Sequence, residues 1–425
     1  MARSKKEIFI AIVMFTVSSL FLFYEMALQV SPSIMTNQLV KSFSVDSAGL
    51  GVMAAFYFYS YTGMQIPAGL LYDHYGPRTL LTWASLVCVL GALFFGFTET
   101  AFWAAIGRFL MGVGSAFAFI GVLVVAARWF SEYYFAFLVG VTQLLAAGGA
   151  MCGVVPLAHA VEAIGWRQTM YWLSGLGFCL AVLCLIILRD HPKHESKKVM
   201  PHETSFWRHI GQVVAQFQTW MIGLYAFTGW GPVTVLASLW GVPFLMVRYN
   251  IDTLKAGLAM TMMWIGVAAA SPIVGWLSNL MGRRKTILWI ASLVGLGCSV
   301  VLIYLPNVPY SATYILLFFM GAASASHMLT FALVRDNNRP GVVATAIGFN
   351  NMAVVIGGAI LQPLVGGILT SLWDNVTMKD GIPYNTLGDY QVALLVVPLL
   401  YLVGFFVTTL SIKETYCKAK YKAHH

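Results

Sequence analysis

The sequence predicts an all-α integral membrane protein of about twelve transmembrane helices, arranged as two pseudo-symmetric six-helix bundles. Three observations predict this fold class. Of the 425 residues, 59% are hydrophobic and only 10% are charged, which differs from the composition of a soluble domain. Apolar segments long enough to cross a bilayer recur along the whole chain, with short polar gaps between them. Finally, the second half of the chain repeats features of the first half.

Each expected span is a stretch of about 20 mostly apolar residues, the length that crosses the hydrocarbon core as a helix. The expected spans are 8–32, 48–71, 79–97, 101–126, 135–158, 167–188, 217–245, 257–278, 286–305, 311–333, 343–369 and 390–411. The first span is retained, because it is too long for a signal peptide and leads directly into more membrane sequence. Five of the six cysteines lie in spans, so no disulfide framework is expected.

An internal repeat justifies the division into two bundles. Residues 109–116 (FLMGVGSA) in the fourth span return as residues 318–325 (FFMGAASA) in the tenth, with most positions identical. A parallel repeat with an even number of spans is typical of secondary transporters, which bind solute near the bilayer midplane between the halves. The expected parts are a bundle at 1–190, a polar cytoplasmic linker at 191–216, a bundle at 217–412 and a cytoplasmic tail at 413–425.

Lysine and arginine residues are divided unequally between alternate loops. With the amino terminus inside, 19 of the 25 lie on inner loops and termini, 5 lie on outer loops, and Arg108 lies within a span. Because positive charge accumulates on the cytoplasmic side, both termini are expected to be cytoplasmic. The short loops favour a bacterial inner (plasma) membrane. The net charge of +9 follows from this topology, so no nucleic-acid partner is expected.

Two motifs resemble those of a known family. Residues 69–78 (GLLYDHYGPR), between the second and third spans, resemble the loop signature of the major facilitator superfamily, and residues 107–114 (GRFLMGVG) resemble its fourth-span motif. The corresponding second-half loop, residues 275–284 (GWLSNLMGRR), has Asn279 where the first copy has Asp73. The resemblance covers essentially the whole chain. It implies the major facilitator fold and movement of a small solute by alternating access.

The same resemblance implies a gate at the cytoplasmic face. Asp73 and Arg78 carry opposite charges that could hold the two bundles together and separate when the bundles rock. Gly69 and Gly76 permit close helix approach and a tight turn. The alternative is that these residues serve only topology and solubility. The second-half positions with the corresponding role, expected to form a weaker lock, are Asn279, Gly282, Arg283 and Arg284.

Among the charged residues, only Glu25 and Arg108 fall clearly inside long apolar spans. A charge at membrane depth costs roughly 2.5 to 3.5 kcal/mol on insertion scales, so such a side chain faces a partner, a cavity or a solute. At a rise of about 1.5 Å per residue, both lie about 10 Å below the outer surface. A solute carboxylate could compete for Arg108 while a proton or solute amine binds Glu25. The alternative is a static ion pair that braces two helices.

The charges also indicate the class of solute. A lone arginine suits one carboxylate, and the second bundle is expected to hold no buried Lys or Arg, which disfavours sugar phosphates. An amino acid, short peptide or monocarboxylate moving with a proton is favoured, and residues 24–29 resemble the first span of the lysosomal dipeptide transporter branch. Sugars and other organic anions are the alternative solutes. Residues that could complete the binding site, or serve as packing instead, are Tyr24, Gln29, Tyr57, Tyr61, Gln143, Tyr225, Trp230, Asn350 and Asn351.

His327 in the tenth span could join Glu25 in proton coupling or serve as a hydrogen-bond partner between helices. No enzyme is predicted, because the sequence lacks a phosphate-binding glycine loop, a metal-spaced cluster and paired catalytic carboxylates at membrane depth. Transport must therefore use a gradient. No cofactor or metal is expected; the expected partners are the solute, protons and the lipid bilayer, with function as a monomer. A solute receptor built on a transport fold is the alternative function.

Overall fold

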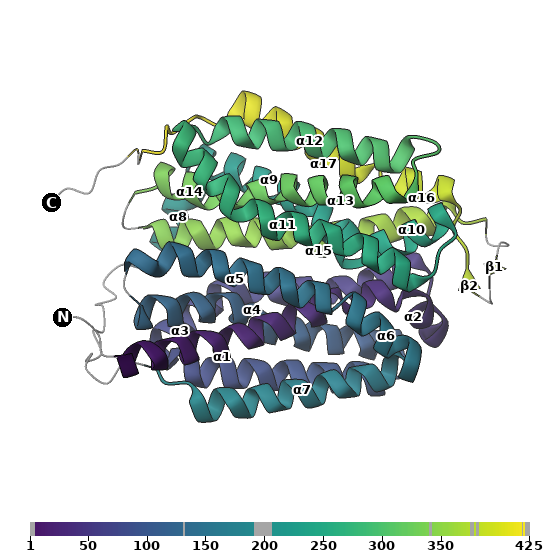
Figure 1. Cartoon of the computed structure of the whole chain (residues 1–425), viewed down its shortest axis with the longest axis horizontal. Helices are drawn as coiled ribbons and strands as arrows, with labels where there is room; N and C mark the ends of the chain where they lie inside the picture. Colours follow the sequence, from purple (N-terminus) through teal and green to yellow (C-terminus); the bar gives the residue numbers. More distant parts are fainter. Residues whose placement is uncertain are drawn as a thin grey trace. The chain divides into compact units, whose positions relative to one another are not determined.

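The computed structural model describes residues 5–130, 132–190, 206–339, 342–374, 378–379, 382–418 and 420. Its helices group into two units, Met1–Lys198 and Val199–His425 (Figure 1). The described residues include eleven helices long and apolar enough to cross a membrane, or twelve if the bent pair Thr36–Phe43 and Ser47–Gly69 counts as one span. The expected all-α membrane fold with about twelve spans is confirmed.

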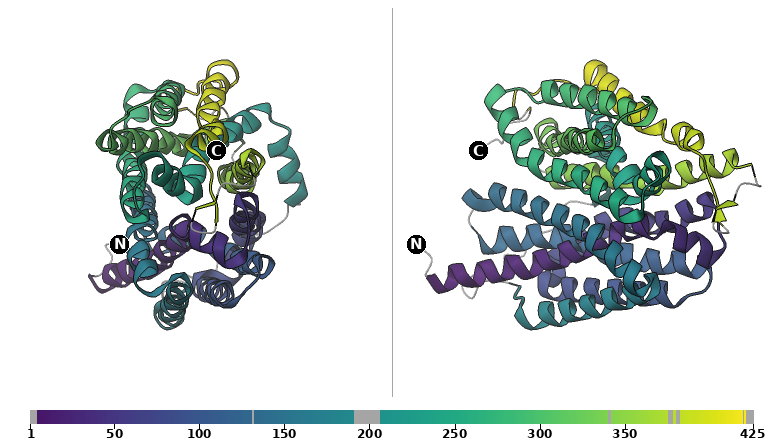
Figure 2. Two further views of the ribbon diagram at one scale, coloured as in Figure 1. Left: turned by 90° about the vertical axis from the view of Figure 1, so that its right-hand side faces the viewer. Right: turned by 45° about the vertical axis from the view of Figure 1, so that its right-hand side comes forward.

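The first unit consists of long helices that run side by side (Figure 2). Its elements are α1 (Lys5–Val30), η1 (Ser31–Ile34), α2 (Thr36–Phe43), α3 (Ser47–Phe97), α4 (Ala101–Trp129), α5 (Glu132–Cys152), α6 (Val155–Ile164) and α7 (Trp166–Ile187). Helix α3 contains both the second and third expected spans, which meet at a kink where Gly76 has φ +73°. Helix α4 packs along α3, and α1 packs against α4 and α5. This arrangement brings the buried faces of α1, α3 and α4 together.

The second unit contains more interrupted helices. Its elements are α8 (Phe206–Val214), α9 (Phe217–Pro232), η2 (Val233–Trp240), α10 (Gly241–Tyr249), α11 (Thr253–Met281), α12 (Lys285–Tyr304), α13 (Tyr310–Ser324), η3 (Ala325–His327), α14 (Met328–Asn337), α15 (Val343–Leu372), β1 (Met378–Lys379), β2 (Ile382–Pro383), α16 (Leu387–Ala393), α17 (Val396–Phe406) and η5 (Val407–Ser411). Helix α8 lies in the segment that we expected to be a linker. Strands β1 and β2 form a short antiparallel pair. In Figure 1, α8 and α14 lie at one end of this unit, and α16 lies at the other.

The internal repeat has a packing role that is the same in both units. A Cβ atom on Gly112 of α4 would collide with the Tyr57 carbonyl of α3, and one on Gly321 of α13 would collide with the Met263 carbonyl of α11. A glycine is therefore required at both places, because the backbones of two helices touch there. In the first unit this contact also places α4 directly against the part of α3 that carries Tyr57.

Candidate functional site

Glu25 is buried near the carboxyl end of α1, with 1% of its surface exposed. Its Oε2 atom accepts a hydrogen bond of 2.8 Å from the hydroxyl of Tyr57 on α3. The Ser115 side chain of α4 lies next to both groups. None of the ion pairs among the described residues includes Glu25. The side chains grouped around this carboxyl thus offer hydroxyl groups rather than a cation.

Arg108 is buried on α4 and binds the backbone of α1. Its Nη1 atom donates to the Leu28 carbonyl at 2.8 Å, and its Nη2 atom donates to the Gln29 carbonyl at 3.2 Å. These carbonyls belong to the last turn of α1, directly before the turn η1. A cation at this negative end of a helix is favourable. The Arg108 Nε atom has no hydrogen-bond partner among the described residues.

Tyr57 joins the two charged residues. The Arg108 Cζ atom lies over the Tyr57 ring, 4.7 Å from its centroid, while the hydroxyl of the same ring donates to Glu25. Tyr61 stacks on Tyr57 with ring centroids 5.8 Å apart and an interplanar angle of 26°. The static ion pair that the sequence allowed is therefore not formed. Glu25 and Arg108 do meet in one cluster, but an aromatic side chain lies between them.

The other residues that we expected at this site in the first unit are placed differently. Gln29 contributes its backbone carbonyl rather than its amide. Tyr24 is buried on α1, but it packs toward α7: a Cβ atom on Gly177 would collide with the Tyr24 hydroxyl. That hydroxyl has no hydrogen-bond partner among the described residues. Gln143 lies half-buried on α5.

His327 occupies the short turn η3, which interrupts the tenth expected span. Its Nδ1 atom lies 2.7 Å from the Ser324 carbonyl, and its ring centroid lies 4.6 Å from that of Trp230. Because a carbonyl only accepts, Nδ1 carries the hydrogen, and the neutral ring then presents Nε2 as an acceptor. The side chain is 3% exposed. The structure therefore places two of the expected residues, His327 and Trp230, in contact within the second unit.

The remaining expected residues of the second unit form hydrogen bonds to their neighbours. The Tyr225 hydroxyl donates to the Leu288 carbonyl at 3.0 Å and lies 2.8 Å from the Ser326 hydroxyl. These contacts join different helical elements, which fits a structural role for Tyr225. The Asn350 amide nitrogen donates to Thr330 at 2.8 Å, whereas its buried Oδ1 atom has no partner among the described residues. Asn351 lies half-buried on α15.

The loop of the first motif is fastened to the end of α7. Asp190 accepts a hydrogen bond of 2.9 Å from the Arg78 backbone N–H, and the Arg78 Nε atom donates to the Leu185 carbonyl at 2.9 Å. A Cβ atom on Gly76 would collide with the Asp190 carboxyl, so this position requires glycine for both space and its positive φ. Asp73 lies on α3 with its side chain outside the described atoms, and Gly69 has open space beside it. Sequence reasoning missed Asp190.

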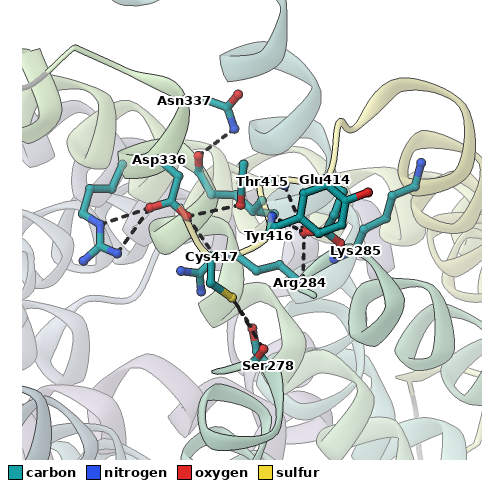
Figure 3. Close-up of polar contacts among 11 residues, drawn as sticks. Ser278, Arg284, Lys285, Asp336, Asn337, Glu414, Thr415, Tyr416 and Cys417 are labelled. Atoms are coloured by element: carbon teal, nitrogen blue, oxygen red, sulfur yellow. Dashed lines mark hydrogen bonds and ion pairs between the residues drawn. The ribbon is translucent and has the colours of Figure 1, made fainter. Parts of the chain in front are cut away.

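The second copy of the motif binds the carboxyl-terminal tail (Figure 3). The Glu414 carboxylate accepts hydrogen bonds from the backbone N–H groups of Arg284 at 3.1 Å and Lys285 at 2.8 Å, where α12 begins. The Arg284 guanidinium pairs with Asp336 at 3.0 Å. Thr415 also donates to Asp336, at 3.2 Å. The tail thus supplies the acidic cap of α12, a role that the sequence did not indicate.

One expectation about this unit is wrong. Arg284 is a buried cation, 5% exposed, although we expected no buried Lys or Arg in the second bundle. Its burial depends on Asp336 and on the docked tail, which local sequence cannot place. Gly282 ends α11 with φ +60°, and its N–H donates to the Asn279 carbonyl. Arg283 donates through its backbone to the Ser278 carbonyl.

Comparison with known proteins gives a family match over nearly the whole chain. The family model of the Major Facilitator Superfamily matches residues 9–255 and 233–423. The chain is 20% identical over 403 residues to the probable galactarate/D-glucarate transporter GudP of Escherichia coli, covering 86% of this chain and 88% of the relative. It is 27% identical over 361 residues to the probable nitrate/nitrite transporter NarK2 of Mycobacterium tuberculosis, covering 82% and 84%.

A solved structure shares the fold. A bacterial homologue of the human lysosomal transporter Spinster, in an inward-facing and unoccupied conformation, superposes with a TM-score of 0.77. The match covers 100% of both chains at 13% sequence identity. At this identity the likeness supports the fold and carries no information about the solute.

Proposed function

Because this chain belongs to the Major Facilitator Superfamily, we propose that it moves a small organic anion together with protons, using Arg108 as the anion contact and Glu25 as the proton acceptor. The family makes the chain a multi-pass membrane protein and a secondary transporter. Beyond the family, the proposal specifies the class of solute, the coupling ion, and Arg108 and Glu25 as the residues that bind them. It also places both termini in the cytoplasm and the protein in a bacterial plasma membrane, acting as a monomer.

One observation carries the proposal: a buried guanidinium that forms no ion pair with an acidic side chain among the described residues. Arg108 is 1% exposed and is absent from the ion pairs among the described residues. Its hydrogen bonds to the Leu28 and Gln29 carbonyls orient the guanidinium, but carbonyls do not cancel its charge. A buried charge without a counter-ion is costly, and a solute carboxylate would supply the counter-charge.

The relatives' names favour an anion over a peptide. The probable solutes named for GudP are sugar diacids, and those named for NarK2 are inorganic anions. A single arginine suits a single carboxylate, so we favour a monocarboxylate or sugar acid. An amino acid or short peptide remains the second candidate, because Glu25 could hold a solute amine. Neutral sugars carry no negative charge to neutralise that of Arg108.

Tyr57 supports coupling between the two charged groups. Its ring lies under the Arg108 guanidinium and its hydroxyl donates to the Glu25 carboxyl. An anion that draws Arg108 from this ring would shift Tyr57, and the hydrogen bond on Glu25 would change with it. We further propose that the His327 ring is a second proton-handling group, supported by its burial beside Trp230. For the gate, we propose that the loops at Gly76 and Gly282 stiffen the cytoplasmic ends of the two units.

The test measures uptake in proteoliposomes. A panel of radiolabelled D-glucarate, D-galactonate, lactate, glucose and dialanine is offered with and without an inward proton gradient. We expect acids alone to accumulate, and we expect Arg108→Gln to weaken their binding about 10- to 150-fold, the range for losing a hydrogen bond to a charged group. Arg108→Lys keeps the buried positive charge. Comparing it with Arg108→Gln separates loss of the anion contact from loss of folding.

The matched control is Arg128→Gln. Arg128 lies on the same helix and also donates to backbone carbonyls, those of Tyr72 and Asp190, but at the end of α4. Uptake of acids with unchanged affinity in Arg108→Gln would remove Arg108 from the site. Tight binding of an acid without uptake in any gradient would favour the receptor alternative.

A further inference from the structure

A cavity of about 730 Å³ lies in the second unit, at the end that carries the carboxyl-terminal tail. It opens between the residues that join α8 to α9, the end of α14 and the tail. The charged residues that line it are Arg339, Lys413 and Lys420, and no acidic residue is among its described lining. Gln212 and Gln216 add side-chain amides, whereas the amides of Gln218 and Asn337 donate to backbone carbonyls. Its volume is in the range of small-molecule sites, about 300 to 1,000 Å³.

Backbone contacts of the tail hold two of these cations in place. The Lys413 N–H donates to the Gln218 side chain at 3.0 Å, and the Gln218 amide donates to the Ser411 carbonyl at 2.8 Å. Further along, the Lys420 N–H donates to the Asp336 carbonyl at 2.8 Å. These bonds fix the main chain of the two lysines beside the cavity, and both residues are among its lining.

Two acidic groups that contact or belong to the tail, Glu414 and Asp336, bind partners outside the cavity lining. Glu414 binds the backbone N–H groups at the start of α12, and the Asp336 carboxylate binds Arg284, Arg335 and Thr415. Figure 3 shows these contacts as one cluster. Neither Glu414 nor Asp336 is among the residues that line the cavity. The charged side chains of its described lining are therefore all positive.

The start of α9 adds to this positive charge. Gln216 and Phe217, which line the cavity, are the N-cap and first residue of this 16-residue helix, and no side chain accepts a hydrogen bond as its cap. The positive end of the helix dipole thus faces the same space as the three cations. Helix α8, with the amphipathic sequence FWRHIGQVV, leads into the cavity and is of the kind that lies at a bilayer surface.

We propose that this cavity binds a phosphate-bearing anion, at a site separate from that of the transported solute. Several cations together with amide donors match the many acceptor oxygens of a phosphate, whereas the single Arg108 suits a carboxylate. The phosphate belongs to a soluble organic phosphate or to the headgroup of an anionic phospholipid; both present the same chemistry to the three cations. Occupancy would fasten the tail to the ends of α9 and α14.

The test uses the full-length protein and two phosphate sources. In detergent, thermal unfolding is followed with increasing inorganic pyrophosphate or glycerol 3-phosphate. In nanodiscs, the same protein is compared between phosphatidylcholine alone and phosphatidylcholine mixed with phosphatidylglycerol. We expect one of the two sources to raise the unfolding temperature, as a ligand of the folded state does. The double variant Lys413→Gln and Lys420→Gln should weaken that effect about tenfold in apparent affinity, the product of two exposed charge contacts.

The matched control is Lys418→Gln, an exposed lysine on the same tail that does not line the cavity. It should bind as the wild type does. Unliganded unfolding temperatures show whether each variant is folded. The proposal is overturned if neither source stabilises the wild type, or if the double variant and the control lose affinity equally. These results do not depend on uptake, so they leave the transport proposal to its own test.

Discussion

Removing one hydroxyl group, in Tyr57→Phe, tests whether Tyr57 couples anion binding to proton movement. The substitution removes the donor of the 2.8 Å hydrogen bond to Glu25 but keeps the ring that lies 4.7 Å under the Arg108 Cζ atom. The bonds from Arg108 to the Leu28 and Gln29 carbonyls also stay. The variant therefore changes the surroundings of the carboxyl while leaving the guanidinium in place.

The size of the effect follows from that hydrogen bond. A hydrogen bond to a charged group contributes about 1.5 to 3 kcal/mol, which corresponds to about 10- to 150-fold in a rate or equilibrium constant. We expect proton-driven uptake to fall by this factor. Binding of the anion, measured by thermal stabilisation in detergent, should stay within about threefold because Arg108 keeps its contacts.

Tyr61→Phe is the matched control, because Tyr61 stacks on Tyr57 and loses the same atom without donating to Glu25. It should retain proton-driven uptake. The reasoning is refuted if Tyr57→Phe accumulates the anion as the wild type does, or if it loses binding and uptake in equal measure. The second result would mean that Tyr57 holds the anion rather than linking it to the proton.

Three further predictions concern the rest of the chain. Glu25→Gln should abolish accumulation driven by a proton gradient while exchange of labelled for unlabelled anion continues; unchanged pH dependence of uptake would remove Glu25 from coupling. Gly112→Ala should lower the free energy of unfolding by about 1 to 3 kcal/mol or more, because the added Cβ would collide with a backbone carbonyl. The control is Gly140→Ala, which has open space beside it and should leave thermal unfolding nearly unchanged. Glu414→Gln should destabilise the protein by about 1 to 2 kcal/mol through loss of the charge at the start of α12, and an unfolding temperature equal to that of the wild type would contradict this.

The membrane spans were predictable because hydrophobic length alone specifies them. The repeated glycines were predictable too, and the structure adds why they recur: Gly112 and Gly321 each touch a carbonyl of a neighbouring helix. Gly76 has a non-helical backbone conformation between the second and third expected spans, which agrees with the tight turn expected from the polar gap there.

The geometry of the candidate site was only partly predictable. Sequence places Glu25 and Arg108 at similar depth, but depth does not define how a helix is rotated about its axis. The position of Tyr57 between them depends on that rotation. Asp190 and Glu414 were missed because their partners lie far away in sequence, 112 residues away for Arg78 and 130 for Arg284. Asp190 follows the last expected span of the first bundle, and Glu414 follows the last span of the second. A lone acidic residue in that position is the signal that could have identified both.

The docking of Glu414 on α12 has a consequence for biosynthesis. The backbone groups that it caps are translated 130 residues earlier. At about 5 to 20 residues per second, the start of α12 waits roughly 6 to 26 s for its carboxylate. During that interval the start of α12 lacks the carboxylate that binds its backbone N–H groups in the folded protein. A chain truncated before residue 414 would keep this immature feature permanently, so an affinity tag is safer at the amino terminus than in place of the tail.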